Sequence, residues 1–414
     1  MTFGPGDGAI TGVESHFFDG THRTVAPEET LDRVAPLLKT MGITRIADVT
    51  GLDRIGIPVA LACRPNARSL SVSQGKGLTI AAARASAVME CIELHHAERP
   101  ELPLLHASVA ELQASGRSIV DVGTLPGATS SRYHRERPLL WAQAQDILHG
   151  KAVWVPYEVV HTSALQPPPT GSGCFSSTSN GLASGNHSLE ALVHALCELI
   201  ERDAAAVWQA QTPLRRAATR VDLARVQDAA CLDVLVRYRA AGIDVHAWET
   251  TSDLSVPAYL CEIVDVNAPA GMSGYTGMGC HLSAPTALLR ALTEAAQSRM
   301  TYITGSRDDL FRRDYRALRI EAPGAGAADD GSGRTLGEAP PGPQNRFLDQ
   351  DLRCLLDHLV KVGLTSVLVV DLTSERLGVP VLRAIVPGLE GPDDEPSYVP
   401  GRRAQAVAQC RESL

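Results

Sequence analysis

The chain has 414 residues with a formal net charge of −9, and 44% of the residues are hydrophobic. This composition is typical of a globular protein with a substantial core, and the acidic balance argues against a general nucleic-acid or anionic-membrane surface. No apolar run reaches the roughly 18 residues of a membrane-spanning helix, and the N-terminal MTFGPGDGAITG has no secretion-signal pattern, so we expect a cytoplasmic protein.

Apolar periodicity predicts the elements in chain order. A helix that begins near Glu29 precedes short strands within 43–49 and 55–63. Three long helical patterns follow, and pairs of strand-like runs lie between them. The predicted long helices span 79–98, 188–210 and 285–303, and the paired strands span 139–147 with 152–161 and 244–250 with 256–265.

The C-terminal part begins with a stretch that has no periodicity. Residues 321–346 are rich in Gly, Ala, Pro and Asp, which predicts a flexible loop. A helix over 349–362 and two apolar strands, SVLVVDL and VPVLRAIV, follow it. Strands therefore mix with helices that come after Gly-rich stretches, which indicates an α/β or α+β fold with one large core.

An eight-residue pattern recurs in the three long helices. SAVMECIE (86–93), HALCELIE (194–201) and RALTEAAQ (290–297) align without gaps. The alignment superposes Glu90, Glu198 and Glu294, and three residues later stand Glu93, Glu201 and Gln297. A spacing of three residues places both side chains of each pair on one face of a helix.

Carboxylates paired on otherwise apolar helices indicate a metal site. Buried acids without partners take up protons or destabilise the fold, whereas a divalent cation between them offsets both effects. Oxygen ligands alone suit Mg²⁺ better than zinc, and the nine cysteines form no CxxC pair. Chance ExxE spacing is the alternative interpretation of each single pair.

A Gly-rich stretch precedes each of the three helices. SQGKG (73–77), SNGLASGN (179–186) and SGYTGMG (273–279) are expected to be loops that present backbone N–H groups to phosphates. The first is not a Walker A loop, because Leu70 and Gly77 replace the glycine and the Ser or Thr of that motif.

Several single residues near these stretches have two interpretations each. Lys76 either contacts a phosphate or is an exposed side chain. Asn186 is either a ligand or the N-cap of the second helix. Arg202 and Arg290 either neutralise the neighbouring acids or clamp a phosphate. His95 and His96 follow Glu93 as ExxH, but a di-iron bundle would need that motif twice.

Longer stretches resemble the YcaO family from about residue 20 to about residue 395. The segments that carry the resemblance are GKGLTIAAARASAVMECIE, NGLASGNHSLEALVHALCELIERD, ALLRALTEAAQSR and VLRAIVPGLEG. The resemblance implies a single α+β YcaO-type domain that binds ATP, with Mg²⁺ held by paired glutamates. We divide it into an N-terminal region for nucleotide contacts and peptide or partner docking, a catalytic core, a flexible loop and a C-terminal part, at residues 1–60, 61–320, 321–346 and 347–414.

Site residues follow from the resemblance position by position, although no catalytic residue is assigned. The acids expected to face magnesium are Glu90, Glu93, Glu190, Glu198 and Glu201. The residues expected near the nucleotide are Lys76, Asn186, Arg202 and Arg290. GTHRTVAPEET (20–30) resembles the family's N-terminal nucleotide contacts and adds Arg23 and Thr30, the latter with a helix N-cap as its alternative.

The resemblance also implies a reaction. Family members phosphorylate a peptide-backbone amide oxygen with ATP, and a nucleophile then replaces it, giving an azoline, a thioamide or an amidine. Azoline-forming members commonly end in a proline-rich tail, whereas this sequence has no proline after Pro400. RTVAPEETL, GITRIADVTGLDRIGIPV and RSLSVSQGKG resemble the TfuA-associated branch, which implies backbone thioamidation.

The expected partners are a TfuA-type protein, a ribosomally made precursor peptide or protein, and a second copy in a homodimer. Three functions remain open besides thioamidation. They are azoline formation at Cys, Ser or Thr, leader-peptide recognition by a non-catalytic subunit, and a metal-dependent hydrolase or oxygenase that uses Glu with His95 and His96.

Overall fold

The computed structural model describes residues 12–18, 20–265, 267, 274–311, 315, 334, 345–393 and 397–409. Helices and sheets are mixed along the chain, and every pairing between the named strands is antiparallel, which confirms the α+β class. The predicted flexible loop over 321–346 lies almost wholly outside the described residues.

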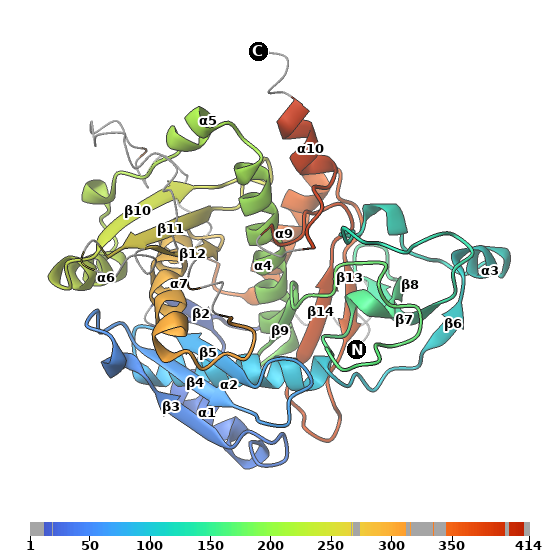
Figure 1. Ribbon diagram of the computed structural model, residues 1–414, viewed down its shortest axis with the longest axis horizontal. Coiled ribbons are helices and arrows are strands. Elements are labelled where there is room, and N and C mark those ends of the chain that lie inside the picture. Colours follow the sequence, from blue (N-terminus) through green and yellow to red (C-terminus); the bar gives the residue numbers. More distant parts are fainter. Residues whose placement is uncertain are drawn as a thin grey trace.

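The N-terminal part forms a three-stranded sheet with a long helix on one face. Its strands are β3 (Arg45–Asp48), β4 (Val59–Cys63) and β5 (Val72–Lys76), in that order. Helix α2 (Ile80–Ala97) packs on β4 and β5 and begins after Thr79, whose side chain accepts a hydrogen bond from the Ala82 N–H. The hairpin β1 (His16–Phe18) and β2 (Thr21–Arg23) and helix α1 (Pro27–Val34) precede the sheet (Figure 1).

A second sheet with a helix repeats this arrangement. Strands β10 (Asp244–Glu249), β11 (Ala258–Val264) and β12 (Gly274–Cys280) lie side by side in that order. Helix α7 (Ala284–Thr304) packs on β11 and β12, and α6 (Ala229–Ala240) contacts β10 and α7. Figure 1 shows the two units at the left, one above the other, with α2 and α7 close together.

A larger sheet forms the right half of the molecule in Figure 1. Its order is β6–β7–β13–β14–β9, and β8 pairs with β7. These strands span Leu105–Ala107, Leu139–Asp146, Leu368–Asp371, Val381–Ile385, Leu182–Ser184 and, for β8, Lys151–Pro156. Helix α4 (Ser188–Gln209) packs on β9 and β14 and contacts α9 (Leu348–Lys361). The remaining helices are α3 (Val109–Ala114), α5 (Pro213–Ala217) and α10 (Arg402–Gln409).

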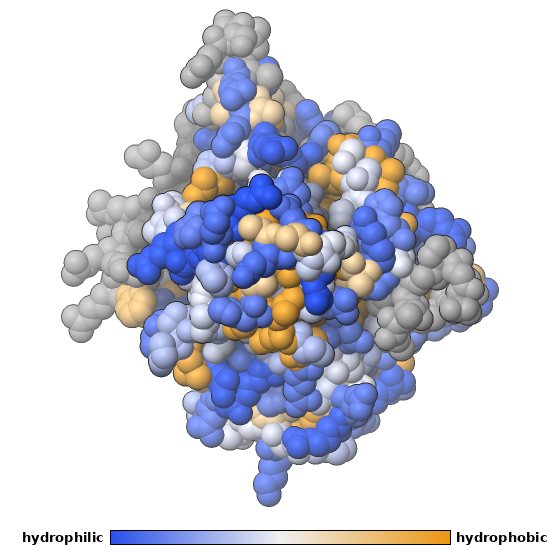
Figure 2. Space-filling view, turned by 90° about the vertical axis from the view of Figure 1, so that its right-hand side faces the viewer, coloured by the Kyte–Doolittle hydropathy of each residue, from blue (hydrophilic) through white to orange (hydrophobic). Residues whose placement is uncertain are grey.

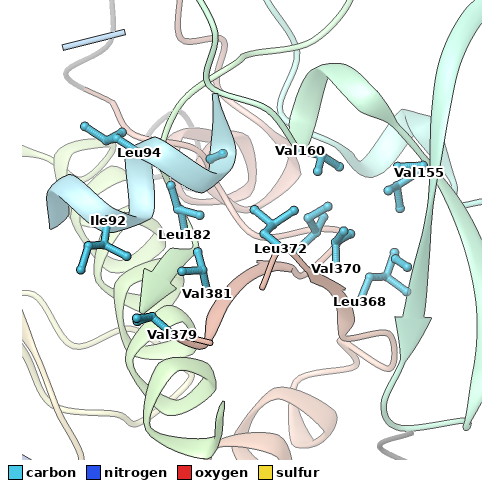
Figure 3. Packing of buried hydrophobic residues seen from close by; sticks show 14 of the residues in the cluster. Ile92, Leu94, Val155, Val160, Leu182, Leu368, Val370, Leu372, Val379 and Val381 are labelled. Carbon is cyan, nitrogen blue, oxygen red and sulfur yellow. The ribbon is translucent and has the colours of Figure 1, made fainter. Parts of the chain in front are cut away.

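The hydrophobic core joins the larger sheet to α2. Figure 3 shows Ile92 and Leu94 of α2 beside Leu182 of β9, with Val370 and Val381 from the neighbouring strands. All five side chains are buried. Helix α2 is therefore fixed between two sheets, which determines where its polar face points.

The predicted elements are confirmed, but the interpretation of the Gly-rich stretches as loops is wrong for two of the three. SQGKG lies largely in β5, and SGYTGMG lies largely in β12. A Cβ atom at Gly75 would stand 2.1 Å from the Ala87 backbone nitrogen of α2, and one at Gly277 would stand 2.2 Å from the Ala295 nitrogen of α7. These glycines therefore serve the close approach of a strand to a helix.

We expect Gly75→Ala to destabilise the protein strongly. The added methyl group would overlap backbone atoms of α2, so the helix must move away from β5, at a cost of about 3 kcal/mol or more. Urea denaturation followed by circular dichroism measures the change. Gly51→Ala is the matched control, because a Cβ there meets nothing within 4 Å, and equal stabilities of the two variants would contradict the packing role.

The surface carries hydrophobic residues in separate groups. Figure 2 shows the side of the molecule with β6 and α3, where hydrophilic residues surround the orange ones. Among the described residues, no helix combines the length and the apolar character that crossing a bilayer requires.

Candidate active site

A cavity of about 510 Å³ opens between α2, α4 and α7. The β1–β2 hairpin, α1 and β5 complete its walls. All residues that the sequence predicted for the site line this one cavity. They are Arg23, Thr30, Lys76, Glu90, Glu93, Asn186, Glu190, Glu198, Glu201, Arg202 and Arg290.

The paired acids reach the cavity from two helices. Glu90 and Glu93 project from α2, and Glu198 and Glu201 project from α4. The third helix contributes Glu294, which the recurring pattern aligned with Glu90 but which was not placed among the predicted ligands. Its position in that pattern was the signal that could have identified it.

Burial makes the four paired acids hold protons more tightly than free carboxyl groups do. It raises the pKa of Glu90 to about 7, although Arg307 and Lys76 oppose the shift. It raises the pKa of Glu93 to about 8, although the N–H and hydroxyl of Ser184 donate to this carboxylate.

The acids of α4 behave in the same way. Burial raises the pKa of Glu198 to about 7 against the attraction of Arg202, and it also raises the pKa of Glu201. A cation bound between α2 and α4 would favour the charged form of all these groups.

Glu294 differs from the other acids because it has a cationic partner. Lys76 Nζ donates to Glu294 Oε2 at 2.6 Å, and the Met278 N–H lies 3.3 Å from Oε1. Burial alone would raise the pKa of Glu294, but Lys76 and Arg202 lower it below its usual value. In this structure Lys76 therefore bridges the cavity from β5 to α7 instead of being an exposed side chain.

Glu190 joins the N-terminal region to the start of α4. Its Oε2 accepts from the backbone N–H and the hydroxyl of Thr24, both at 2.8 Å, and its Oε1 accepts from the Asn186 N–H at 3.2 Å. Arg23 Nε lies 3.9 Å from Oε1. The short segment around Arg23 is thus fixed against the cavity by this carboxylate.

The two helix N-cap alternatives are wrong. His187 caps α4, so Asn186 is not its N-cap, and Thr30 lies within α1. Asn186 Nδ2 instead donates to Thr30 Oγ1 at 3.0 Å. Both side chains line the cavity, so their contact with a nucleotide remains a prediction.

One end of the cavity is electropositive. Arg23 and Arg290 are close enough to repel each other's charge. Three histidines lie around them, and burial, followed by Arg290, lowers the pKa of each. These are His22, His194 and His281. Neutral imidazoles beside two guanidinium groups make this end suitable for an anion, and no sequence pattern singled out the histidines.

The donor set fits Mg²⁺ in the way that phosphate enzymes hold this ion. The described residues contain no group of three or more His, Cys, Asp or Glu side chains already assembled to hold a metal. Mg²⁺ usually takes one or two carboxylates and fills the rest of its sphere with water and phosphate oxygens. Carboxylates on facing helices, with cations nearby, meet that requirement.

The alternative metal site is not supported by the geometry. Neither His95 nor His96 lines the cavity. The His96 ring Nδ1 lies 2.7 Å from the Ile92 carbonyl of its own helix, and burial lowers the pKa of both imidazoles. The ExxH sequence therefore does not bring its histidines to the acids.

Comparisons with known proteins agree with this geometry. Residues 74–390 match the family model described as YcaO cyclodehydratase, ATP- and Mg²⁺-binding. An uncharacterized protein of the tfuA 3′ region of Rhizobium leguminosarum is 38% identical over 89% of this chain and 88% of its own. An uncharacterized protein of Methanothermobacter thermautotrophicus is 36% identical over 93% and 99%.

Two solved structures share the fold. A YcaO from Methanopyrus kandleri bound with AMPPCP and Mg²⁺ has a TM-score of 0.73 at 23% identity and covers 94% of this chain and 99% of its own. A heterocyclase in complex with substrate and cofactor has a TM-score of 0.78 at 20% identity over 95% of this chain. This chain spans 56% of the heterocyclase chain.

Proposed function

Because this chain belongs to the YcaO family, we propose that it uses ATP and Mg²⁺ to phosphorylate a peptide-backbone amide oxygen, which a nucleophile then displaces. The observation that carries the proposal is the meeting of paired acids from α2 and α4 with Lys76, Arg202 and Arg290 in one cavity. Acids and cations placed together in this way suit a phosphate–metal complex.

The acidic side chains and the basic side chains of the cavity would have different roles. Glu90, Glu93, Glu198 and Glu201 would hold Mg²⁺, which when bound offsets negative charge on the phosphoryl group in transit. Arg202 and Lys76 stand beside these acids and would contact phosphate oxygens. Arg23 and Arg290 would hold the rest of the nucleotide at the electropositive end. The protein contributes mostly positioning and electrostatic stabilisation.

Backbone thioamidation is the outcome that we favour. The relative encoded in the tfuA 3′ region supports a TfuA-type partner for this chain. With sulfide as the nucleophile the amide oxygen is replaced by sulfur, and phosphate leaves with the oxygen. The substrate would be a ribosomally made peptide or protein, and a homodimer remains a prediction that light scattering can test.

Mass spectrometry of a co-expressed peptide tests the reaction. The chain is expressed with a TfuA-type protein and a candidate precursor peptide from a neighbouring gene. We expect the peptide to gain the mass difference between sulfur and oxygen. Loss of one water instead would indicate an azoline and overturn thioamidation. Peptide binding by a protein without affinity for nucleotide would indicate a recognition subunit.

A further inference from the structure

The cavity has a second end that the proposed function leaves unassigned. Its wall follows α7 from Arg290 to Thr301, eleven residues apart, or about 16 Å at 1.5 Å per residue. The electropositive group lies at the Arg290 end, and the paired acids lie between the two ends. The lining of the far end is mostly uncharged and polar, and comprises Gln74, Gln297, Ser298, Thr301 and Arg307.

Gln297 presents a hydrogen-bond acceptor to this end of the cavity. Its side chain lines the cavity, and its Nε2 donates to the Gln74 backbone carbonyl at 3.3 Å, which identifies the nitrogen of the amide. The described residues provide no hydrogen-bond partner for Gln297 Oε1. The neighbouring Gln74 side chain is 2% exposed and accepts from the Thr301 hydroxyl, so its buried amide is closed to a ligand.

Arg307 presents one edge of its guanidinium group to the same end. Helix α7 ends at Thr304, and the left-handed backbone of the next residue, Gly305 (φ 53°), lets the chain turn back towards the cavity. Asp309 accepts from Arg307 Nε at 2.9 Å and from Nη2 at 2.5 Å, which fixes the fork. The described residues provide no hydrogen-bond partner for Nη1.

The charge at this end does not favour a second phosphate. Asp309 neutralises Arg307, and Asp308 accepts from the Ser71 N–H nearby. The carboxyl group of Glu90 faces the same space, within the reach of the Arg307 charge. An uncharged ligand with both hydrogen-bond donors and acceptors suits this surface better than an anion.

We propose that Gln297 and Arg307 form the subsite for the peptide backbone of the substrate. Arg307 Nη1 donates to a backbone carbonyl oxygen and Gln297 Oε1 accepts from a backbone N–H, and this places the amide under attack next to the paired acids. The subsite reads backbone groups, so it accepts different side chains. The inference rests on the proposed function, because that function places the nucleotide at the opposite end.

Binding of a backbone-only probe tests the subsite. The probe is acetyl-hexaglycine amide, titrated by calorimetry into the full chain with Mg²⁺ and a non-hydrolysable ATP analogue. We expect Arg307→Met and Gln297→Leu each to weaken probe binding about tenfold, as loss of one hydrogen bond would. Affinity for the nucleotide analogue should change less than about twofold, because no contact to it is removed.

Arg33→Met is the matched control, since Arg33, like Arg307, pairs with a carboxylate close to it in sequence but lies outside the cavity. Two variants keep the test valid if one of them fails to fold. Unchanged probe affinity in both variants, or a wild-type protein that binds nucleotide but not the probe, overturns the subsite. Loss of nucleotide affinity in the variants also overturns it. A wild-type protein without nucleotide affinity overturns the proposed function itself.

Discussion

Glu90→Gln and Glu201→Gln are each expected to abolish Mg²⁺-dependent ATP hydrolysis. The two side chains reach the cavity from different helices, so each substitution removes one of the four proposed ligands of the metal, from one side of the cavity. The shape is retained while the charge is lost. Changing an outer partner of a metal already costs 10–100-fold, so loss of a direct ligand should lower turnover by at least about 100-fold. Phosphate release at saturating ATP measures it.

Glu262→Gln is the matched control for this experiment. Glu262 of β11 is 1% exposed, and burial raises the pKa of its carboxyl group to about 7, as it does for Glu90. It does not line the cavity. A variant at this position should hydrolyse ATP like the wild type. Full activity of Glu90→Gln and Glu201→Gln would rule out the metal assignment.

The ligand-free protein is expected to lose stability as the pH rises from about 5 to about 9. Glu90, Glu93 and Glu198 have raised pKa values in the folded state, near 7 to 8, against about 4.3 in an unfolded chain. The folded state therefore binds more protons than the unfolded state in this range, and its advantage is complete below the unfolded pKa and is lost above the folded pKa. Melting temperatures across this pH range measure the slope.

Substitution of one buried acid, or addition of Mg²⁺ with ATP, should each reduce the loss of stability at high pH. Glu93→Gln removes the most strongly shifted acid, so it should stabilise the ligand-free protein at pH 8.5 by about 1–2 kcal/mol after allowance for screening by water in the open cavity. Mg²⁺ with ATP should stabilise the wild type most at high pH, because the metal competes with protons for the carboxylates. A melting temperature that rises with pH in the ligand-free protein would contradict the raised pKa values.

Much of the fold was predictable because the long helices have a clear apolar periodicity in the sequence. Period 3.6 located α2, α4 and α7, and their aligned glutamates showed which faces would meet. The Gly-rich stretches around Gly75 and Gly277 were wrongly predicted as loops, because the local sequence does not show that a helix lies against each glycine. From the local sequence alone, glycine indicates a turn or loop, whereas here tertiary packing places it in a strand.

The site was predictable where a residue belonged to a recurring pattern. Glu294 belonged to one, but its ion pair with Lys76 joins positions 218 residues apart, which no local pattern reveals. Gln297 takes the place of Glu93 and Glu201 in the recurring pattern, whereas Arg307 belongs to no pattern, and only the fold brings the two side chains to one place. The predicted division of the domain at residues 60, 320 and 346 stays a prediction.

The ion pair between Lys76 and Glu294 makes the site responsive to both charges of a ligand at once. A negative group that draws Lys76 away leaves the Glu294 carboxylate without its hydrogen-bonded cation and with only the charge of Arg202 nearby, so that carboxylate favours a new cation. Free phosphate provides a partner only for Lys76, whereas a metal–phosphate complex provides an anion for Lys76 and a cation for Glu294. We therefore expect the replacement of Lys76 by a metal ion beside Glu294 to favour binding of the metal–nucleotide complex over free nucleotide, before any chemistry begins.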